Sequence, residues 1–413
     1  MKRLFIALGI GFWLLAAIPH AYALNREITA VFRPDSAKPD ENKFINTTPA
    51  SGYCELRPTQ CRQAGMFSIR LPIRFQSNGP IQPHHTDPQQ GATFKVPADW
   101  RQASVFNAET GESEVVEVRV RAIGSAYELS DTAMNLVGEG ATPGTAHGML
   151  WGASWVNAPL PCRYSGLGYY SPKTYAFLWQ TPVEAHCSKL ARYLIPSLAY
   201  AYLDFAYELR TPNPLKMSIG HYIGSLTYGI GPGQDFDMGM IMVANEAQLT
   251  LDFNLEVQHA LKVDVPPGGN RVELIPQGGW QAWVSQGRKP TRLFRDQTFH
   301  ISSSSRFKMS LECQYGAGAN TCMLWEPNVG HAVPVNISVS LPHGLTDAAG
   351  QTVSRRPLRL DGIGTELFQP GFYVERKPAT LHFEIARDEV EEMLGTSSRT
   401  YAGNVTVIWD SEV

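Results

Sequence analysis

Stretches in which apolar and polar side chains alternate recur along the whole chain. In one of them, Val116, Val118 and Val120 alternate with charged residues. The same pattern occupies residues 67–73, 249–257, 307–313 and 333–341. Successive side chains of a strand point to opposite faces, so each stretch predicts a strand with one face in a core and one in water. Clusters of glycine and proline separate the stretches as turns, which predicts an all-β chain of β-sandwich architecture.

Helical patterns are few. Residues 385–394 place apolar side chains at helical spacing before Gly395, which predicts a short helix. The apolar stretch 183–209 is expected to contain one short helix before strands resume.

The first 23 residues have the composition of a secretory signal peptide. Lys2 and Arg3 precede an apolar stretch over 4–18, and small residues stand at Ala21 and Ala23. The alternative is a membrane anchor, but the apolar stretch is shorter than the roughly 20 residues that a spanning helix needs. We therefore expect residues 1–23 to be a signal peptide and the chain to be exported.

The six cysteines form three pairs that are close in the sequence. In an exported chain an even number of cysteines predicts disulfides, and neighbour pairing closes each loop at low entropic cost. A zinc site is the alternative, but no CxxC motif is present. The expected disulfides are Cys54–Cys61, Cys162–Cys187 and Cys313–Cys322.

An internal similarity divides the chain. Residues 222–227 and 401–406 both follow the pattern Tyr-x-Gly-x-aliphatic-Thr. We interpret each copy as the closing strand of a sandwich, with a glycine-rich hinge after the first. The expected division is a first β-sandwich domain over 24–235, a linker over 236–247 and a second domain over 248–413.

The last residues predict a strand that reaches the C-terminus. Its alternate side chains point to one side, and they include Tyr401, Val405, Val407, Trp409 and Val413. A long apolar edge strand promotes aggregation unless a partner strand covers it. The alternative is an ordinary buried last strand of a complete sandwich.

Tyr401-x-Gly403 followed by alternating aliphatic residues resembles the closing strand of subunits built by the chaperone–usher pathway. The resemblance covers roughly residues 245–413. It implies an incomplete immunoglobulin-like sandwich that lacks its final strand. A periplasmic chaperone lends that strand during transit, and the adjacent pilus subunit replaces it. The residues that the resemblance assigns to the chaperone and donor-strand groove are Tyr401, Gly403, Val405, Val407, Trp409 and Val413.

A whole domain precedes this pilin-like domain, which resembles the arrangement of a two-domain fimbrial tip adhesin. The resemblance therefore implies two tandem immunoglobulin-like β-sandwich domains, the first a lectin-like receptor-binding domain. It further implies export through the periplasm, passage through an outer-membrane usher and an extracellular position at the tip of the fimbrium.

The expected receptor is a glycan on a host or other surface. Sugars present apolar C–H faces ringed by hydroxyls, so a binding site combines aromatic rings with polar side chains. The segment 151–179 is rich in aromatic residues. Burial of these rings in the core is the alternative. The candidates for receptor binding are Trp151, Trp155, Tyr169, Tyr170 and Trp179.

A metal site and an enzyme are weaker hypotheses. His84-His85-x-Asp87, with His147 or His186, could bind a metal, but adjacent histidines chelate poorly, and no metal or cofactor is expected.

No GxSxG, HExxH or P-loop motif occurs, so we do not expect the chain to be an enzyme. A secreted carbohydrate-active enzyme with paired carboxylates stays open as an alternative. A structural minor pilus subunit without receptor binding is the other alternative. The net charge of −3 argues against nucleic acid as a partner.

Overall fold

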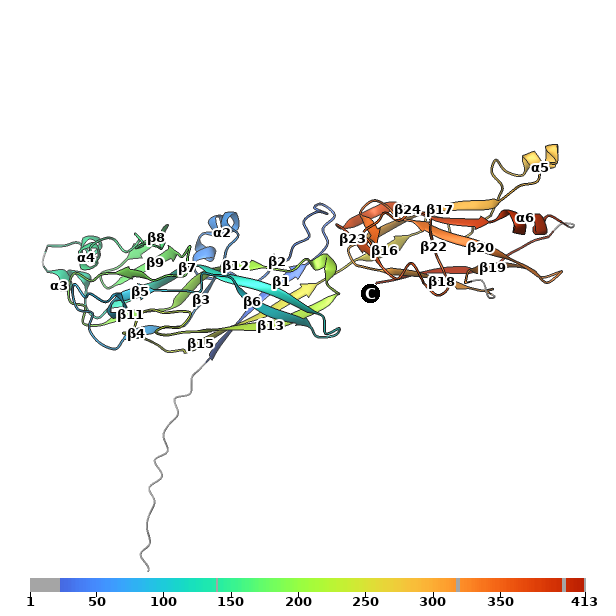
Figure 1. Cartoon of the computed structure of the whole chain (residues 1–413). Helices are drawn as coiled ribbons and strands as arrows, with labels where there is room; N and C mark the ends of the chain where they lie inside the picture. The colour runs from blue at the N-terminus through green and yellow to red at the C-terminus, as the bar shows by residue number, and fades with distance from the viewer. Residues whose placement is uncertain (1–22, 139, 317–319, 396–398, 412–413) are drawn as a thin grey trace, which may run out of the picture.

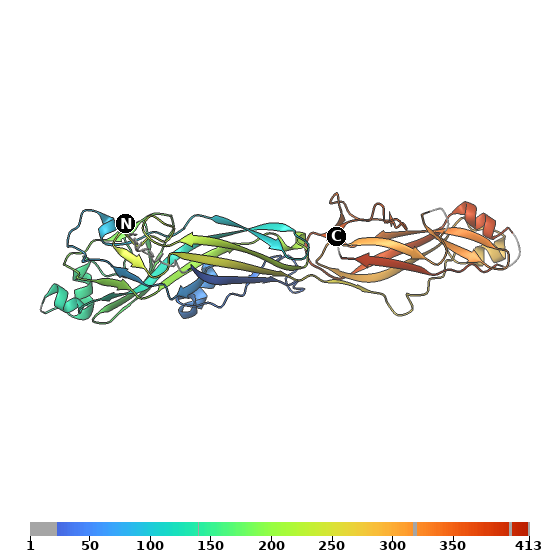
Figure 2. The same cartoon turned by 90° about the horizontal axis from the view of Figure 1, so that it is seen from below.

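The computed structural model describes residues 23–138, 140–316, 320–395 and 399–411. The chain forms two β-rich lobes that lie end to end in an elongated molecule (Figures 1 and 2). We call residues 23–257 the N-terminal lobe and residues 261–411 the C-terminal lobe, because each contains its own hydrophobic core. Strands dominate both lobes, and no described helix exceeds eight residues, so the all-β prediction is confirmed.

The N-terminal lobe contains a 13-stranded sheet. Its elements are β1 (Ala23–Phe32), β2 (Ile45–Asn46), α1 (Tyr53–Leu56), α2 (Pro58–Ala64), β3 (Phe67–Leu71), β4 (Phe75–Ser77), β5 (Ala92–Phe94), β6 (Arg101–Asn107), β7 (Ser113–Leu129), α3 (Ala133–Val137), α4 (Pro143–Leu150), β8 (Arg163–Tyr170), β9 (Thr174–Gln180), β10 (Cys187–Lys189), β11 (Leu198–Tyr200), β12 (Leu203–Arg210), β13 (Gly220–Gly229), β14 (Met242–Ala244) and β15 (Gln248–Val257).

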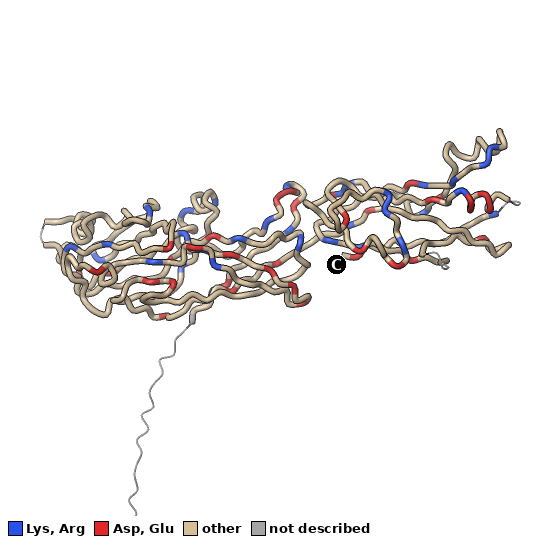
Figure 3. Tube along the Cα trace, viewed as in Figure 1, with Lys and Arg blue, Asp and Glu red and all other residues tan. Residues whose placement is uncertain are grey.

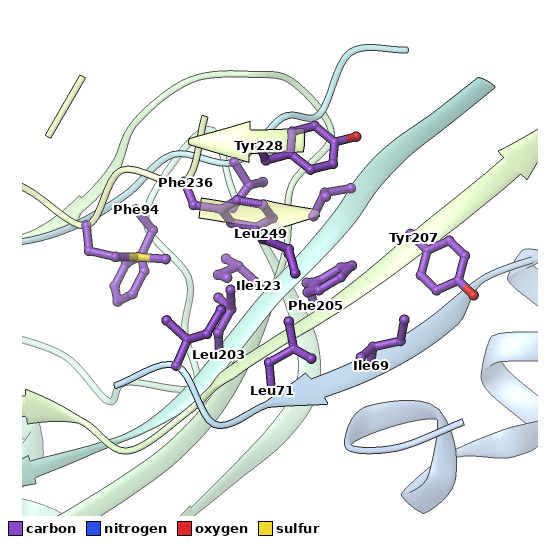
Figure 4. Packing of buried hydrophobic residues seen from close by; sticks show 14 of the residues in the cluster. Ile69, Leu71, Phe94, Ile123, Leu203, Phe205, Tyr207, Tyr228, Phe236 and Leu249 are labelled. Atoms are coloured by element: carbon purple, nitrogen blue, oxygen red, sulfur yellow. The ribbon is translucent and has the colours of Figure 1, made fainter. Parts of the chain in front are cut away.

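Strand β7 holds this sheet together. It is 17 residues long and pairs with β6, β12, β9 and β11 along its length. Its apolar residues Val116, Val118 and Val120 are buried, as the alternation predicts. Buried side chains from β3, β7, β12, β13 and β15 meet in one core (Figure 4).

The passage between the lobes lies later in the chain than the predicted linker over 236–247. Phe236 packs against Phe205 and Tyr228, with ring centroids 5.7 Å apart in each pair. Strand β15 forms ten-residue ladders with both β13 and β1, so residues 248–257 belong to the N-terminal lobe. The first copy of the Tyr-x-Gly pattern, on β13, is therefore an interior strand and closes no lobe.

The described part of the C-terminal lobe contains three sheets, two of which face each other across the core. Its elements are β16 (Leu261–Asp264), α5 (Gln281–Gln286), β17 (Leu293–Ser303), β18 (Lys308–Cys313), β19 (Cys322–Glu326), β20 (His331–Ser340), β21 (Leu345–Asp347), β22 (Arg356–Pro357), β23 (Phe368–Pro370), β24 (Val374–Ile385), α6 (Arg387–Met393) and β25 (Val405–Asp410). One of the two facing sheets has the order β16-β17-β24-β20-β19, with β22 beside β20, and the smaller one consists of β18 and β25. The third sheet is the pair β21 and β23. Buried side chains of β17, β20 and β24 face those of β18 across the core.

Three disulfides join the predicted pairs Cys54–Cys61, Cys162–Cys187 and Cys313–Cys322. The first closes the loop that carries α1 and α2, and the third joins β18 to β19. The neighbour pairing is therefore confirmed.

Two helix predictions had different outcomes. Helix α6 lies within the predicted segment 385–394. The segment 183–209 contains β10, β11 and β12 and no helix, so that prediction is wrong. These strands pair with β5, β4, β7 and β3. The apolar residues that suggested a helix therefore lie on paired strands.

Apart from Ala23, the predicted signal peptide lies outside the described residues. Within the described part of the chain, no helix is long and apolar enough to cross a membrane.

Candidate functional site: an open strand edge and an aromatic face

Strand β25 lies at the edge of the smaller sheet of the C-terminal lobe. It pairs antiparallel with β18, with Val405 opposite Cys313 and Asp410 opposite Lys308. Val405, Val407 and Trp409 all pack against the second core, yet each remains only half-buried. Strands with alternating apolar residues normally bury that face, so the core is incompletely covered here.

The opposite edge of β25 has no partner strand among the residues that the structure describes. Strand β16 is the edge strand of the facing sheet and pairs with β17 alone. The ring of Trp409 lies 5.7 Å from that of Phe299 on β17, which places the two free edges on the same side of the lobe. Leu261 and Val263 of β16 are also half-buried against the core. We call the seam between β16 and β25 the open edge.

The other predicted groove residues lie at or beyond the far end of this edge. The Tyr401 hydroxyl is 2.8 Å from Nδ1 of His331, which fixes the start of the segment. A Cβ atom at Gly403 would lie 3.0 Å from the carbonyl oxygen of Met323, so glycine permits the close approach of the two backbones. Val413 lies outside the described residues.

The three predicted tryptophans of the N-terminal lobe are core residues. Trp151, Trp155 and Trp179 are 4%, 0% and 0% exposed. The Trp155 ring lies 4.4 Å from that of Trp151, and the indole N–H of Trp179 donates to the carbonyl oxygen of Trp155 at 2.9 Å. A buried ring cannot stack on a sugar. The prediction that these three residues bind the receptor is therefore wrong.

The two predicted tyrosines are on the surface. Tyr169 and Tyr170 are each 55% exposed on β8, which pairs with β9 alone among the described strands. Tyr164, at the other end of β8, is 60% exposed. Consecutive side chains of a strand point to opposite sides, and the Tyr170 ring lies 5.7 Å from that of Tyr175, so Tyr169 and Tyr170 do not share one face. An accessible aromatic ring can offer its apolar face to a ligand.

An arginine that the sequence analysis did not single out lies near Tyr169. The Arg70 guanidinium lies 4.1 Å from the centre of the Tyr202 ring and donates to Oδ2 of Asp204 at 2.9 Å. Tyr169 is close enough to Arg70 and Tyr202 to influence both of their pKa values. A guanidinium held in this way is a preorganised donor for a carboxylate or hydroxyl group.

Burial beneath this arginine shapes the electrostatics of the face. The Asp204 side chain is 3% exposed, and burial raises the pKa of its carboxyl group against the opposing effect of Arg70. Burial also raises the pKa of Tyr202 to about 12, so its hydroxyl stays protonated at neutral pH. A Cβ atom at Gly52 would lie 2.2 Å from Asp204, so only glycine leaves room for the carboxylate.

Further arginines lie on β8 and on the loop that carries α1 and α2. The Tyr53 hydroxyl is 3.4 Å from the carbonyl oxygen of Ser165, which joins the loop carrying α1 and α2 to β8. Arg57, Arg62 and Arg163 are exposed on these elements. Lysine and arginine positions occur along both lobes (Figure 3). We call Tyr169, Tyr202 and Arg70 the aromatic face. The sequence signal for it was weak, because β3, β8 and the Tyr202 loop meet only through pairing across β7, β9 and β12.

The histidines of the metal hypothesis do not converge. His147 is buried and lies between the Tyr127 hydroxyl and the carbonyl oxygen of Ser171, at 2.5 Å and 2.8 Å. Nδ1 of His85 lies 2.8 Å from the carbonyl oxygen of Asp87. No group of three possible metal ligands occurs within the described ranges.

No protein-family profile matches the sequence, and no curated protein matches it. Solved structures that align with it include fimbrial tip adhesins. CfaE, the adhesive subunit of CFA/I fimbria of enterotoxigenic Escherichia coli, is 10% identical over 94% of this chain and 92% of its own, with a TM-score of 0.23. Its mutant G168D is 9% identical over 95% of each chain, with a TM-score of 0.25.

A third structure is the CsuC–CsuE chaperone–tip adhesion subunit pre-assembly complex from the archaic chaperone-usher Csu pili of Acinetobacter baumannii. It is 10% identical over 94% of this chain and 98% of its own, with a TM-score of 0.22. TM-scores of this size do not establish a common fold.

Proposed function

We propose that the chain is a fimbrial tip adhesin of the chaperone–usher type, exported through the periplasm and displayed outside the cell. The open edge of the C-terminal lobe is the observation that carries this proposal. A strand edge beside half-buried core residues invites pairing with another chain, and soluble proteins normally block such an edge. A donated strand would complete the sheet by main-chain hydrogen bonds and cover Val405, Val407 and Trp409.

The donors in this proposal change during assembly. A periplasmic chaperone covers the open edge first, and the adjacent pilus subunit replaces it at the usher. A tip subunit accepts a strand and has no need to donate one. The N-terminal lobe is then free to face outward.

The proposed receptor is a surface glycan, bound at the aromatic face. The exposed ring of Tyr169 can stack on a sugar C–H face. Arg70 adds a fixed donor for a sugar hydroxyl or carboxylate. One such site is weak, and display of many fimbriae on one cell would raise the avidity through effective concentration.

Two neighbouring residues of β25 provide the test of strand acceptance. Val407 is half-buried toward the core, whereas Thr406 is exposed on the other face. We expect Val407→Asp to abolish a stable complex with a fimbrial periplasmic chaperone in co-expression, because the charge would enter the seam that the donated strand covers. Thr406→Asp is the matched control and should keep the complex.

A chain that is stable and monomeric without any chaperone would contradict the proposal, as would equal behaviour of the two variants. Glycan-array binding of the purified complex then tests the receptor. Loss of binding in Tyr169→Ala is expected, and a structural minor subunit would bind no glycan at all.

A further inference from the structure

A cavity of about 490 Å³ lies where the two lobes meet. Both lobes contribute to its walls, and so do the first residue of β16 and the residue that follows β25. Its lining residues are Glu109, Thr110, Met217, Ser218 and Ile219 of the N-terminal lobe and His259, Leu261, Ser305, Arg306 and Ser411 beyond it.

The connection between the lobes is fixed by hydrogen bonds at this cavity. Nε2 of His259 lies 2.9 Å from the carbonyl oxygen of Met217, and Nδ1 lies 3.2 Å from the Ser304 hydroxyl. Arg306 lies 3.9 Å from the carboxylate of Glu112 on the N-terminal lobe. The cavity is therefore bounded by residues that hold the lobes together.

The cavity lies at one end of the open edge. Leu261 is the first residue of β16, and Ser411 directly follows β25. Strand β25 runs toward the cavity, because its last residue, Asp410, precedes Ser411. Antiparallel pairing is slightly more stable than parallel pairing, so a strand added to β25 would begin at the cavity and run away from it.

We propose that this cavity receives the N-terminal residues of the strand that completes the C-terminal lobe. The proposal rests on the proposed function, since it requires a donated strand. The occupant is a peptide N-terminus with a free α-amino group, followed by a small or apolar residue. Its volume lies within the range of ordinary ligand pockets.

The lining matches this chemistry. An α-amino group is largely protonated near neutral pH. Among the described residues, the Glu109 carboxylate forms no ion pair, so it can accept the ammonium group, whereas Arg306 already faces Glu112. The buried hydroxyl of Ser305 lacks a hydrogen-bond partner and lines the same space. Met217 and Leu261 offer apolar contact to the following side chain.

The inference has a structural consequence. A strand that only completed the sheet would touch the C-terminal lobe alone. A strand that also enters the cavity touches residues 217–219 of the N-terminal lobe. The receptor-binding lobe and the next subunit would then share a contact.

Three synthetic peptides test the inference on the full chain, refolded in their presence. The core peptide has nine alternating threonine and valine residues. The extended peptide adds Ala-Leu at its N-terminus, and the third is the extended peptide with an acetylated N-terminus. We expect the extended peptide to bind roughly tenfold more tightly than the core peptide, and acetylation to remove part of that gain.

Ile219→Trp fills the cavity and should abolish the gain of the extended peptide without weakening the core peptide. Ile223→Trp is the matched control, because Ile223 is similarly exposed on β13 but lies outside the cavity lining. Equal affinities of core and extended peptides for the native chain, or a gain that survives Ile219→Trp, would overturn the inference and leave the proposed function intact. Binding of none of the peptides would overturn strand acceptance itself.

Discussion

The substitution Trp155→Ala tests which aromatic residues belong to the core and which belong to the surface. Trp155 is 0% exposed, and its ring lies within 4.4–5.6 Å of the rings of four aromatic neighbours. A buried aromatic side chain removes ~200 Å² from water, which at ~25 cal/mol/Å² corresponds to ~5 kcal/mol. Partial collapse of the cavity lowers the expected loss in unfolding free energy to about 3–5 kcal/mol.

The matched surface variant is Tyr169→Ala. Tyr169 is 55% exposed, so we expect its unfolding free energy to change by no more than about 0.5 kcal/mol. Urea unfolding followed by far-ultraviolet circular dichroism gives both values. Glycan binding below the unfolding transition should survive Trp155→Ala and be lost in Tyr169→Ala.

Two results would refute this reasoning. A loss below about 1 kcal/mol for Trp155→Ala would place its ring outside the core. Loss of glycan binding in a folded Trp155→Ala chain, with binding kept in Tyr169→Ala, would return the receptor site to the tryptophans.

Two other predictions concern stability. Burial lowers the pKa of Lys189 to about 8 from 10.5, so the unfolded chain binds more protons between these values, and stability should rise with pH across that range. For the native chain, the midpoint of urea unfolding should be higher at the upper end of this pH range than at the lower end. The Lys189→Met variant should not show this difference. Replacing Cys54 and Cys61 together by alanine should lower the free energy of unfolding by ~2.5 kcal/mol. The loss is modest because the disulfide joins residues only seven positions apart and so closes a short loop. Differential scanning calorimetry measures the thermal unfolding midpoint of the N-terminal lobe. An unchanged midpoint in the double variant would contradict this prediction.

Alternation of side chains was sufficient to locate many strands. The predicted runs over 67–73, 249–257, 307–313 and 333–341 overlap β3, β15, β18 and β20. Period-two patterning reports that one face is buried, which is a local property of the chain. Spacing also sufficed for the disulfides, because each closes a short loop.

Pairing partners were not predictable from such patterns. Strand β15 has the same alternation whichever lobe contains it, and only its ladders with β13 and β1 assign it to the first. The sequence suggested a binding role for Trp151, Trp155 and Trp179, because composition does not distinguish a buried ring from an exposed one. Arg70 meets Tyr202 and Asp204 only when β3 pairs with β12, a contact between residues more than 130 positions apart.

The ladder between β1 and β15 has a consequence for the order of folding. Ala23 lies opposite Gln248, and Phe32 lies opposite Val257. A chain that emerges from its N-terminus presents β1 long before β15 exists, and contacts between such distant segments form slowly. Until residue 257 has emerged, β1 keeps an unpaired edge that can pair wrongly or aggregate. The lobe that is synthesised first must therefore wait for its last strand, and its nascent form exposes the edge of β1 until then.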